Sequence, residues 1–203
     1  MDFNRAGIPL MELVTEPVIP DAETAGKFAR ELQLLLRTLR ASEANLEKGE
    51  MRVEANVSVS ADGTPSKDYV EVKNINSFRA VERAITFEIE RQTALLKKGE
   101  RVVKATRGWD EAKQETFHQR FKEGSADYRY FPEPDLPKLF ISEIPEFSRD
   151  ALKASLPELP SERRERYQKE LKIRVSDSII ITENFEAAAF FDKVIQDLTN
   201  QDQ

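Results

Sequence analysis

The ten residues MRVEANVSVS, at positions 51–60, alternate strictly between apolar and polar side chains. Successive side chains of a β-strand point to opposite faces, so the alternation predicts a strand with one buried face and one face in water. The turn residues of ADGTPSKD follow, and YVEVKNI, at 69–75, then predicts a second strand. Two such strands joined by a turn form a hairpin. The pattern therefore predicts a sheet with a polar surface.

Two long segments repeat apolar residues at helical spacing. The first follows Pro20 and Asp21, and Asp21 is a suitable N-cap for it. The second starts after Asn76 or Ser77, either of which can cap it, and ends at the Lys-Lys-Gly sequence of 97–99. Both segments are predicted to be amphipathic helices that pack in the same domain as the sheet.

Further extended segments are predicted on either side of these helices. RVVKATRGW and ETFHQRF, at 101–109 and 115–121, form a second predicted hairpin around DEAKQ. IPLMELV, at 8–14, is predicted to be a strand in which Pro9 restricts where pairing starts. A proline-rich stretch that excludes a helix leads to a short predicted strand at 139–141.

The last part of the chain has a helical pattern throughout. Pro157 and Pro160 interrupt it, and Ser161 is a possible cap for the basic helix that follows. We predict an α+β fold class, with an antiparallel-sheet domain and packed helices over 1–147 and a small all-helical region over 148–203. Hairpins separated by helices argue against a parallel, doubly wound sheet.

Composition excludes several classes of protein and site. The sequence has no cysteine, so disulfides, thiolate metal sites and cysteine nucleophiles are excluded. No secretory signal and no membrane-spanning apolar run are visible, and a cytoplasmic location is expected. The 37 acidic and 31 basic residues give a net charge of −6, which argues against a general nucleic-acid coat. A nucleic-acid partner would require a local patch or another subunit.

Polar residues of the first hairpin are the first candidates for a functional site. Those that share one face are Arg52, Glu54, Asn56, Ser58, Glu71 and Lys73. Composition alone favours a solvent-exposed face with cross-strand ion pairs. Two features favour a binding site instead. Asn56 and Asn74 interrupt otherwise ideal strands, and KNINSF places amides, Lys73 and a helix N-terminus together, which suits an anion such as phosphate.

Other candidates each have an ordinary structural alternative. Glu12 and Glu16 could hold Mg²⁺ from one face of the predicted strand, although such glutamates are more often surface residues. Arg129, among the aromatics of DYRYFPEPD, could bind phosphate or a base, but a rigid crossover with buried aromatics is favoured. The only histidine, His118, is interpreted as structural or surface. The basic run of 161–174 could be a local nucleic-acid contact, but such a run is more often the solvated face of a helix.

Several long motifs, in order along the chain, resemble one protein family. They are DFNRAGIPLMELVTEP, MRVEANVSV, EVKNINSFRAVERAI, KATRGWDEAKQET, DYRYFPEPDLP and LPELPSERRERY. The chain is similar over nearly its whole length to the B subunit of aspartyl/glutamyl-tRNA amidotransferase, GatB. The resemblance implies a ligase subunit that uses ATP to phosphorylate the side-chain carboxylate of Glu on tRNA(Gln) or Asp on tRNA(Asn). Ammonia from the A subunit then forms the carbon–nitrogen bond.

The resemblance also implies cofactors, partners and site residues. Glu12 matches a family glutamate that resembles a Mg²⁺ ligand, and ATP is the phosphoryl donor. The other matching residues are assigned to a nucleotide or acyl-tRNA pocket as a group: Arg5, Glu16, Arg52, Glu54, Asn56, Glu71, Lys73, Asn74, Asn76 and Arg129. Phosphate or nucleotide contact is expected above all from Arg5, Lys73 and Arg129. The implied partners are the A and C subunits and a misacylated tRNA, without a membrane.

The family pattern extends beyond this sequence on both sides. Family members have a preceding half-domain with a histidine and further acids for the same metal, and a longer helical region with a C-terminal tail domain. The chain is therefore expected to be a fragment that has no amidotransferase activity alone. The alternative function is a non-catalytic tRNA-binding or assembly module of the same fold.

Overall fold

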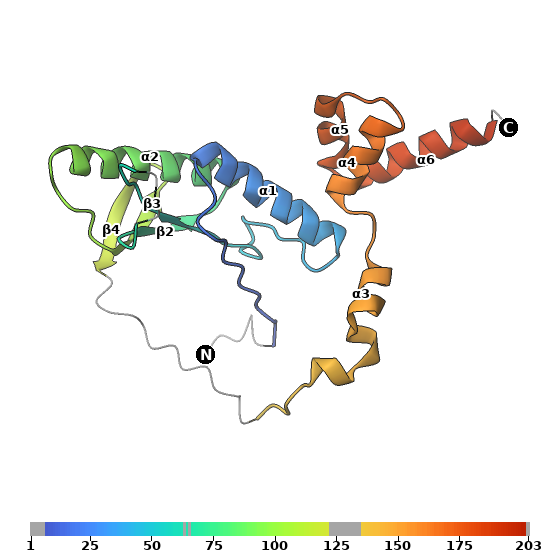
Figure 1. Cartoon of the computed structure of the whole chain (residues 1–203), viewed down its shortest axis with the longest axis horizontal. Coiled ribbons are helices and arrows are strands. Elements are labelled where there is room, and N and C mark those ends of the chain that lie inside the picture. The colour runs from blue at the N-terminus through green and yellow to red at the C-terminus, as the bar shows by residue number, and fades with distance from the viewer. Residues whose placement is uncertain (1–6, 63, 65, 122–134, 202–203) are drawn as a thin grey trace.

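The computed structural model describes residues 7–62, 64, 66–121 and 135–201. Within these residues, four strands form one sheet in the order β1-β2-β3-β4 (Figure 1). The strands are β1 (Val53–Val57), β2 (Val70–Ile75), β3 (Ala105–Asp110) and β4 (Glu115–Phe121). Helix α2 (Phe78–Lys97) lies over one face of the sheet, and α1 (Ala22–Thr38) packs against α2.

The sheet is mixed. The β1–β2 and β3–β4 pairs are antiparallel, as the two predicted hairpins require. The central β2–β3 pair is parallel, with Val72 opposite Arg107, and here the structure differs from the predicted antiparallel sheet. The reason is α2, which carries the chain from the end of β2 back to the start of β3, because parallel strands need such a crossover. The α+β class is confirmed.

The hydrophobic core lies between α2 and the sheet face that it covers. Val81 and Ala84 of α2 are buried there against Val70, Val72 and Trp109 of the strands. The strand residues in this core alternate with polar residues that point the other way, as the pattern of 51–60 predicts for β1. Burial of one sheet face therefore leaves a second, polar face on the side away from α2.

Both long helices begin at predicted caps. The Asp21 side chain accepts a hydrogen bond from the Thr24 backbone N–H at 2.7 Å. The Ser77 side chain accepts one from the Ala80 N–H at 3.0 Å, so Ser77 caps α2 and Asn76 does not. Each side chain satisfies a backbone donor that has no partner inside its helix.

Helix α1 approaches α2 closely at Gly26. A Cβ atom at this position would lie 2.1 Å from Oε1 of Glu82, which is closer than atoms can approach. The same Glu82 oxygen accepts a hydrogen bond from Arg30 Nη2 at 2.8 Å. The glycine thus makes room for an ion pair between the two helices.

A β-bulge in β2 accounts for one of the unusual asparagines. Val53 pairs with Ile75, whereas Ala55 pairs with Val72, so the register shifts between these two pairs. Asn74 lies in this bulge with φ of 64°. Asparagine adopts this left-handed conformation more readily than most residues, because its short polar side chain can hydrogen-bond locally.

Two predicted strands are absent from the described residues. Residues 8–14 are extended but pair with no strand in the described part of the chain, and Leu10 is 94% exposed. Residues 139–141 run into the short 3₁₀ helix η1 (Ile141–Glu143) instead of a strand. An apolar, β-prone sequence forms a strand only where a neighbour supplies the backbone hydrogen bonds.

The C-terminal part is helical, as predicted. After η2 (Pro145–Phe147) come α3 (Arg149–Ser155), α4 (Pro160–Lys169), α5 (Val175–Thr182) and α6 (Phe185–Gln201). The predicted Ser161 cap is wrong. Leu159 is the N-cap of α4, and the Glu162 side chain accepts a hydrogen bond from the Leu159 N–H at 2.9 Å.

None of the helices in the described residues is long and apolar enough to cross a membrane. The division of the chain at residue 147 stays a prediction.

Candidate functional site on the open face of the sheet

The sheet face turned away from α2, here called the open face, gathers the polar residues predicted from the first hairpin. Glu54, Asn56, Glu71 and Lys73 project from β1 and β2 on this side. Lys73 Nζ lies 2.8 Å from Glu54 Oε2 and 3.7 Å from Glu71 Oε1. The structure therefore brings one cation and two carboxylates together, as the alternation of side chains along the two strands predicts.

Strands β3 and β4 extend the open face with residues that sequence reasoning missed. Thr106 Oγ1 donates a hydrogen bond to Glu71 Oε2 at 2.9 Å. Gly108 pairs with Lys73 on one side and with Phe117 on the other. A Cβ atom at Gly108 would lie 2.5 Å from Cζ of Phe117, so the outer edge of this ring lies over the glycine. A glycine inside a predicted strand was the available signal for this close approach.

Lys73 is held in its charged form. Burial lowers the pKa of the ammonium, but the hydrogen bond to Glu54 and the charges of Glu54 and Glu71 outweigh it, so the pKa is raised above its ordinary value. The charge of Arg120 acts in the opposite direction on the pKa of Lys73. A lysine with a raised pKa is a permanent cation at neutral pH, suited to neutralising an anion but not to accepting a proton.

The predicted convergence of Lys73 with the N-terminus of α2 does not occur. Lys73 points to the open face and is paired with glutamates, whereas α2 covers the opposite face. Asn76 is exposed in the link between β2 and α2, and Asn74 is exposed at the bulge. Arg52 is exposed just before β1. The positive charge of Lys73 on the sheet is therefore not reinforced by the N-terminus of α2.

Glu12, the predicted metal ligand, has no cluster of further acidic or histidine side chains around it in the described part of the chain. Glu12 and Glu16 are exposed in the extended N-terminal segment. Nowhere among the described residues do three His, Asp or Glu side chains come together as they would around a metal ion. Mg²⁺ at phosphate sites is commonly bound by one or two carboxylates together with substrate phosphates and water, so the exposed Glu12 fits the role of one such ligand. Arg5 and Arg129 lie outside the described residues.

A second polar cluster, also missed from sequence, lies under α2. Glu88 is fully buried and accepts hydrogen bonds from Arg91, Gln92 and Thr116. Arg107 Nε lies 3.1 Å from Glu88 Oε1. Burial raises the pKa of the Glu88 carboxyl, but these hydrogen bonds outweigh it and the pKa is lowered. The hydrogen bonds and ion pairs of this cluster join α2 to β3 and β4.

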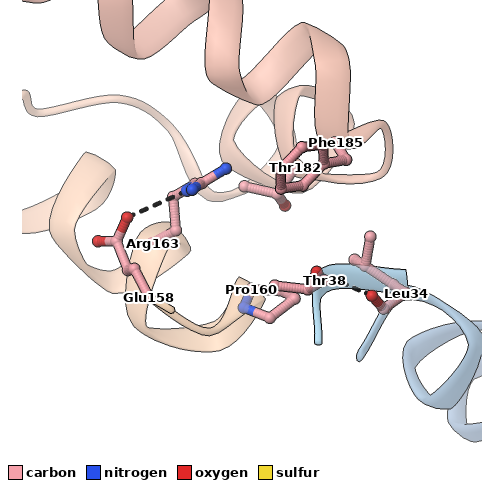
Figure 2. Close-up of a pocket in the computed structure, with 7 residues that line it drawn as sticks. All are labelled: Leu34, Thr38, Glu158, Pro160, Arg163, Thr182 and Phe185. Carbon is pink, nitrogen blue, oxygen red and sulfur yellow. Dashed lines mark hydrogen bonds and ion pairs between the residues drawn. The ribbon is translucent and has the colours of Figure 1, made fainter. Parts of the chain in front are cut away.

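Within the described residues, the junction of α1 with the C-terminal helices contains a small recess (Figure 2). Leu34 and Thr38 face Pro160 and Phe185 across it. Its volume of about 10 Å³ gives room for about one water molecule. Arg164 of α4 forms an ion pair with Glu31 of α1 at the same junction. These features indicate a contact between two parts of the chain and not a substrate site.

A wider hollow of about 410 Å³ lies beside α2 and the end of β3. Phe87 and Trp109 line it with their rings 6.4 Å apart, edge to face. Arg83 donates a hydrogen bond to Gln114 at 3.0 Å on its wall. None of the described residues predicted for the site lines this hollow.

Comparison with known proteins identifies the family. Residues 1–145 match the family described as "GatB/GatE catalytic domain". The chain belongs to this family. Since the matched region contains the whole sheet and α2, the open face is a surface of a GatB/GatE catalytic domain.

Curated relatives agree with this assignment. The B subunit of the aspartyl/glutamyl-tRNA(Asn/Gln) amidotransferase of Crocosphaera subtropica is 43% identical over 198 residues, which cover 96% of this chain and 39% of that protein. The chloroplastic/mitochondrial B subunit of the glutamyl-tRNA(Gln) amidotransferase of Physcomitrium patens is 45% identical, over 97% of this chain and 34% of its own length. The chain thus spans less than two fifths of the length of these GatB relatives.

Proposed function

We propose that this chain is part of the B subunit of a glutamine-dependent amidotransferase that converts Glu-tRNA(Gln), Asp-tRNA(Asn) or both to the amidated forms. The observation that carries the proposal is its similarity, over 96% of its length, to a B subunit named for both tRNAs. The match of residues 1–145 to the family described as "GatB/GatE catalytic domain" supports a role of the sheet in the chemistry.

The proposed reaction has two steps. A side-chain carboxylate oxygen of the aminoacyl group attacks the γ-phosphorus of ATP, and ADP leaves. Ammonia from the A subunit then attacks the acyl carbon and loses a proton, the carbon–oxygen bond breaks, and inorganic phosphate leaves with its electron pair. Phosphoryl transfer depends on charge neutralisation and positioning, and the permanently charged Lys73 on the open face is suited to both.

Mg²⁺ would supply further charge neutralisation when bound, and Glu12 is the proposed ligand from this chain. The exposed position of Glu12 leaves its carboxylate accessible. No cluster of three acidic or histidine side chains surrounds Glu12 in the described residues. The other proposed site residues of this chain bind and orient the substrates. We assign the pocket role to the open-face residues Glu54, Asn56, Glu71 and Lys73, with Arg52, Asn74, Asn76, Glu16, Arg5 and Arg129 as further proposed members.

The proposal extends to assembly and location. Relatives that are named as B subunits imply a multi-subunit enzyme, and the A and C subunits are the proposed partners together with misacylated tRNA. The cytoplasm is the proposed location, although the Physcomitrium relative is named for chloroplasts and mitochondria. We propose a boundary near residue 147, because the family match ends at residue 145 and the chain after η2 is helical.

A chimaeric protein tests the function. The matching segment of the Crocosphaera B subunit is exchanged for this chain, the other subunits are added, and formation of Gln-tRNA(Gln) is measured with ATP and glutamine. We expect conversion, and we expect Lys73→Ala to reduce it at least tenfold, with Lys104→Ala as the matched lysine control. A chimaera that assembles but forms no amidated tRNA contradicts the proposal.

A non-catalytic tRNA-binding or assembly module is the second candidate. It shares the fold with the first candidate and differs from it in the metal. It predicts tRNA binding with strong salt dependence and no ATP binding, whereas the catalytic role predicts Mg²⁺-dependent ATP binding that Glu12→Ala abolishes. Equilibrium dialysis with labelled ATP separates the two.

A further inference from the structure

The hollow beside α2 and the end of β3 is lined by two aromatic rings. Phe87 is half-buried in α2, and its ring meets the ring of Trp109, which is 5% exposed, edge to face. The volume of the hollow, about 410 Å³, lies in the range of small ligand sites. The hollow lies on the α2 side of the sheet, and none of the open-face residues lines it.

Hydrogen bonds fix one end of the hollow. Trp109 Nε1 donates to Glu111 Oε2 at 2.6 Å, and Glu111 Oε1 lies 3.4 Å from Arg83 Nη1. Arg83 also donates to Gln114 at 3.0 Å, and the Gln114 amide donates to the Glu111 carbonyl at 2.6 Å. The bond from Trp109 lowers the pKa of the Glu111 carboxyl, and the charges of Arg83 and Arg79 add to this effect. The negative charge at this end is therefore already compensated.

Glu90 brings an unpaired carboxylate to the hollow. It is exposed, lines the hollow, and forms no ion pair with any residue that the structure describes. None of the residues three or four positions away along α2 is basic, so the helix itself offers no partner. Glu82, the other acid of the lining, is paired with Arg30 at 2.8 Å. The hollow thus combines aromatic rings with one carboxylate that is available to a cation.

We propose that this hollow binds an arginine side chain of another polypeptide, with the guanidinium group against Phe87 and paired with Glu90. A guanidinium group is planar, so it stacks on an aromatic ring and pairs with a carboxylate at the same time. The apolar stem of the side chain gains contact with the rings. Thr86 and Glu90 are exposed at the hollow, so a side chain that projects from another protein can reach it.

The chemistry of the lining disfavours other occupants. An anionic group would be repelled by Glu90 and by Glu82. An apolar side chain would remove water from the Glu90 carboxylate without replacing its hydrogen bonds, which costs free energy. The inference does not depend on the proposed function, because neither the open face nor a tRNA enters it.

The test uses the single tryptophan of the chain as a reporter. Because Trp109 is the only tryptophan, its indole N–H gives one signal in the NMR spectrum of the ¹⁵N-labelled chain. The probe is the peptide acetyl-Gly-Arg-Gly-amide, and its control is the same peptide with citrulline, which keeps the shape of arginine without the charge. We expect a saturable shift of the indole signal with the arginine peptide and none with the citrulline peptide.

Substitutions separate the two contacts. Glu90→Gln should weaken binding of the arginine peptide about 2- to 5-fold by loss of the ion pair, and Phe87→Leu should weaken it about 2- to 5-fold by loss of the ring. Glu100→Gln, at an exposed position that does not line the hollow, is the matched control and should leave the affinity unchanged.

Two results would overturn the inference: equal shifts with the arginine and citrulline peptides, and wild-type affinity for Glu90→Gln. Because Glu90 is exposed, the thermal unfolding of Glu90→Gln should match the wild type. This variant keeps the test decisive if Phe87→Leu, which alters the contact with Trp109, does not fold.

Discussion

At the residue scale, several polar contacts between α2 and the sheet converge on Glu88. Its carboxylate is fully buried and is paired with Arg91 and Arg107. Gln92, one turn later, donates to the Val57 carbonyl and to Glu88, both at 3.1 Å. A buried charge of this kind is tolerated because hydrogen bonds replace the lost water.

Glu88→Ala should destabilise the chain by about 3–5 kcal/mol, because it leaves Arg107 without its buried partner. Urea unfolding followed by circular dichroism measures the change. Glu90→Ala, at an exposed position of the same helix, is the control and should change the free energy by less than about 0.5 kcal/mol. Similar effects of the two substitutions would show that the cluster contributes little.

The lowered pKa of Glu88 also predicts a pH dependence. The unfolded chain binds the proton at a higher pH than the folded chain does, so the stabilisation is present above the ordinary glutamate pKa of 4.5 and is lost as the pH falls through the lowered folded pKa. In urea unfolding between pH 6 and pH 3, Glu88→Gln should show a smaller loss of stability on acidification than the wild type. An unchanged profile would contradict the prediction.

At the scale of elements, the crossing of α1 and α2 depends on a small residue. Gly26→Leu should lower the free energy of unfolding by about 1–3 kcal/mol, because the larger side chain must displace Glu82 and its ion pair with Arg30. Ala94→Leu, at an exposed position of α2, is the control and should be nearly neutral. Thermal unfolding of the two variants measures the effect. An unchanged stability of Gly26→Leu would contradict the close approach of the two helices at this residue.

The elements that could be predicted from sequence were those with local signals. The caps at Asp21 and Ser77 and the alternation of β1 depend on neighbours in the chain. The same alternation predicted that Glu54 and Lys73 share a face. The segment 8–14 has an equally clear β pattern but pairs with nothing in the described residues. Pairing depends on a distant strand, which a local pattern does not specify.

Only those site residues could be predicted whose position follows from the alternation of side chains along a strand. The parallel β2–β3 contact brings Thr106 and Gly108 beside Glu71 and Lys73, and no local pattern in the sequence indicates which strands are neighbours. Phe117 was equally hidden, because an exposed ring in a strand resembles a core residue until its face is known.

At the scale of the whole molecule, the chain spans less than two fifths of the length of its GatB relatives. Its described residues hold a cation but do not assemble a metal site. We expect no amidotransferase activity from the isolated chain, and ADP release in the presence of Mg²⁺, ATP and Glu-tRNA(Gln) measures this. Boiled protein gives the background rate, and ADP formation clearly above it would refute the expectation.

The parallel pairing of β2 with β3 has a consequence for the order of folding. Each hairpin closes a short loop, over 58–69 and 111–114, whereas β2 and β3 meet only after the chain has passed through residues 76–104. Because closure of a longer loop costs more entropy, contacts between distant segments form late. Pulsed hydrogen exchange during refolding should therefore protect the amides shared by β3 and β4 before those that join β2 to β3. The sheet of this catalytic domain would then be completed from its two edges towards its centre.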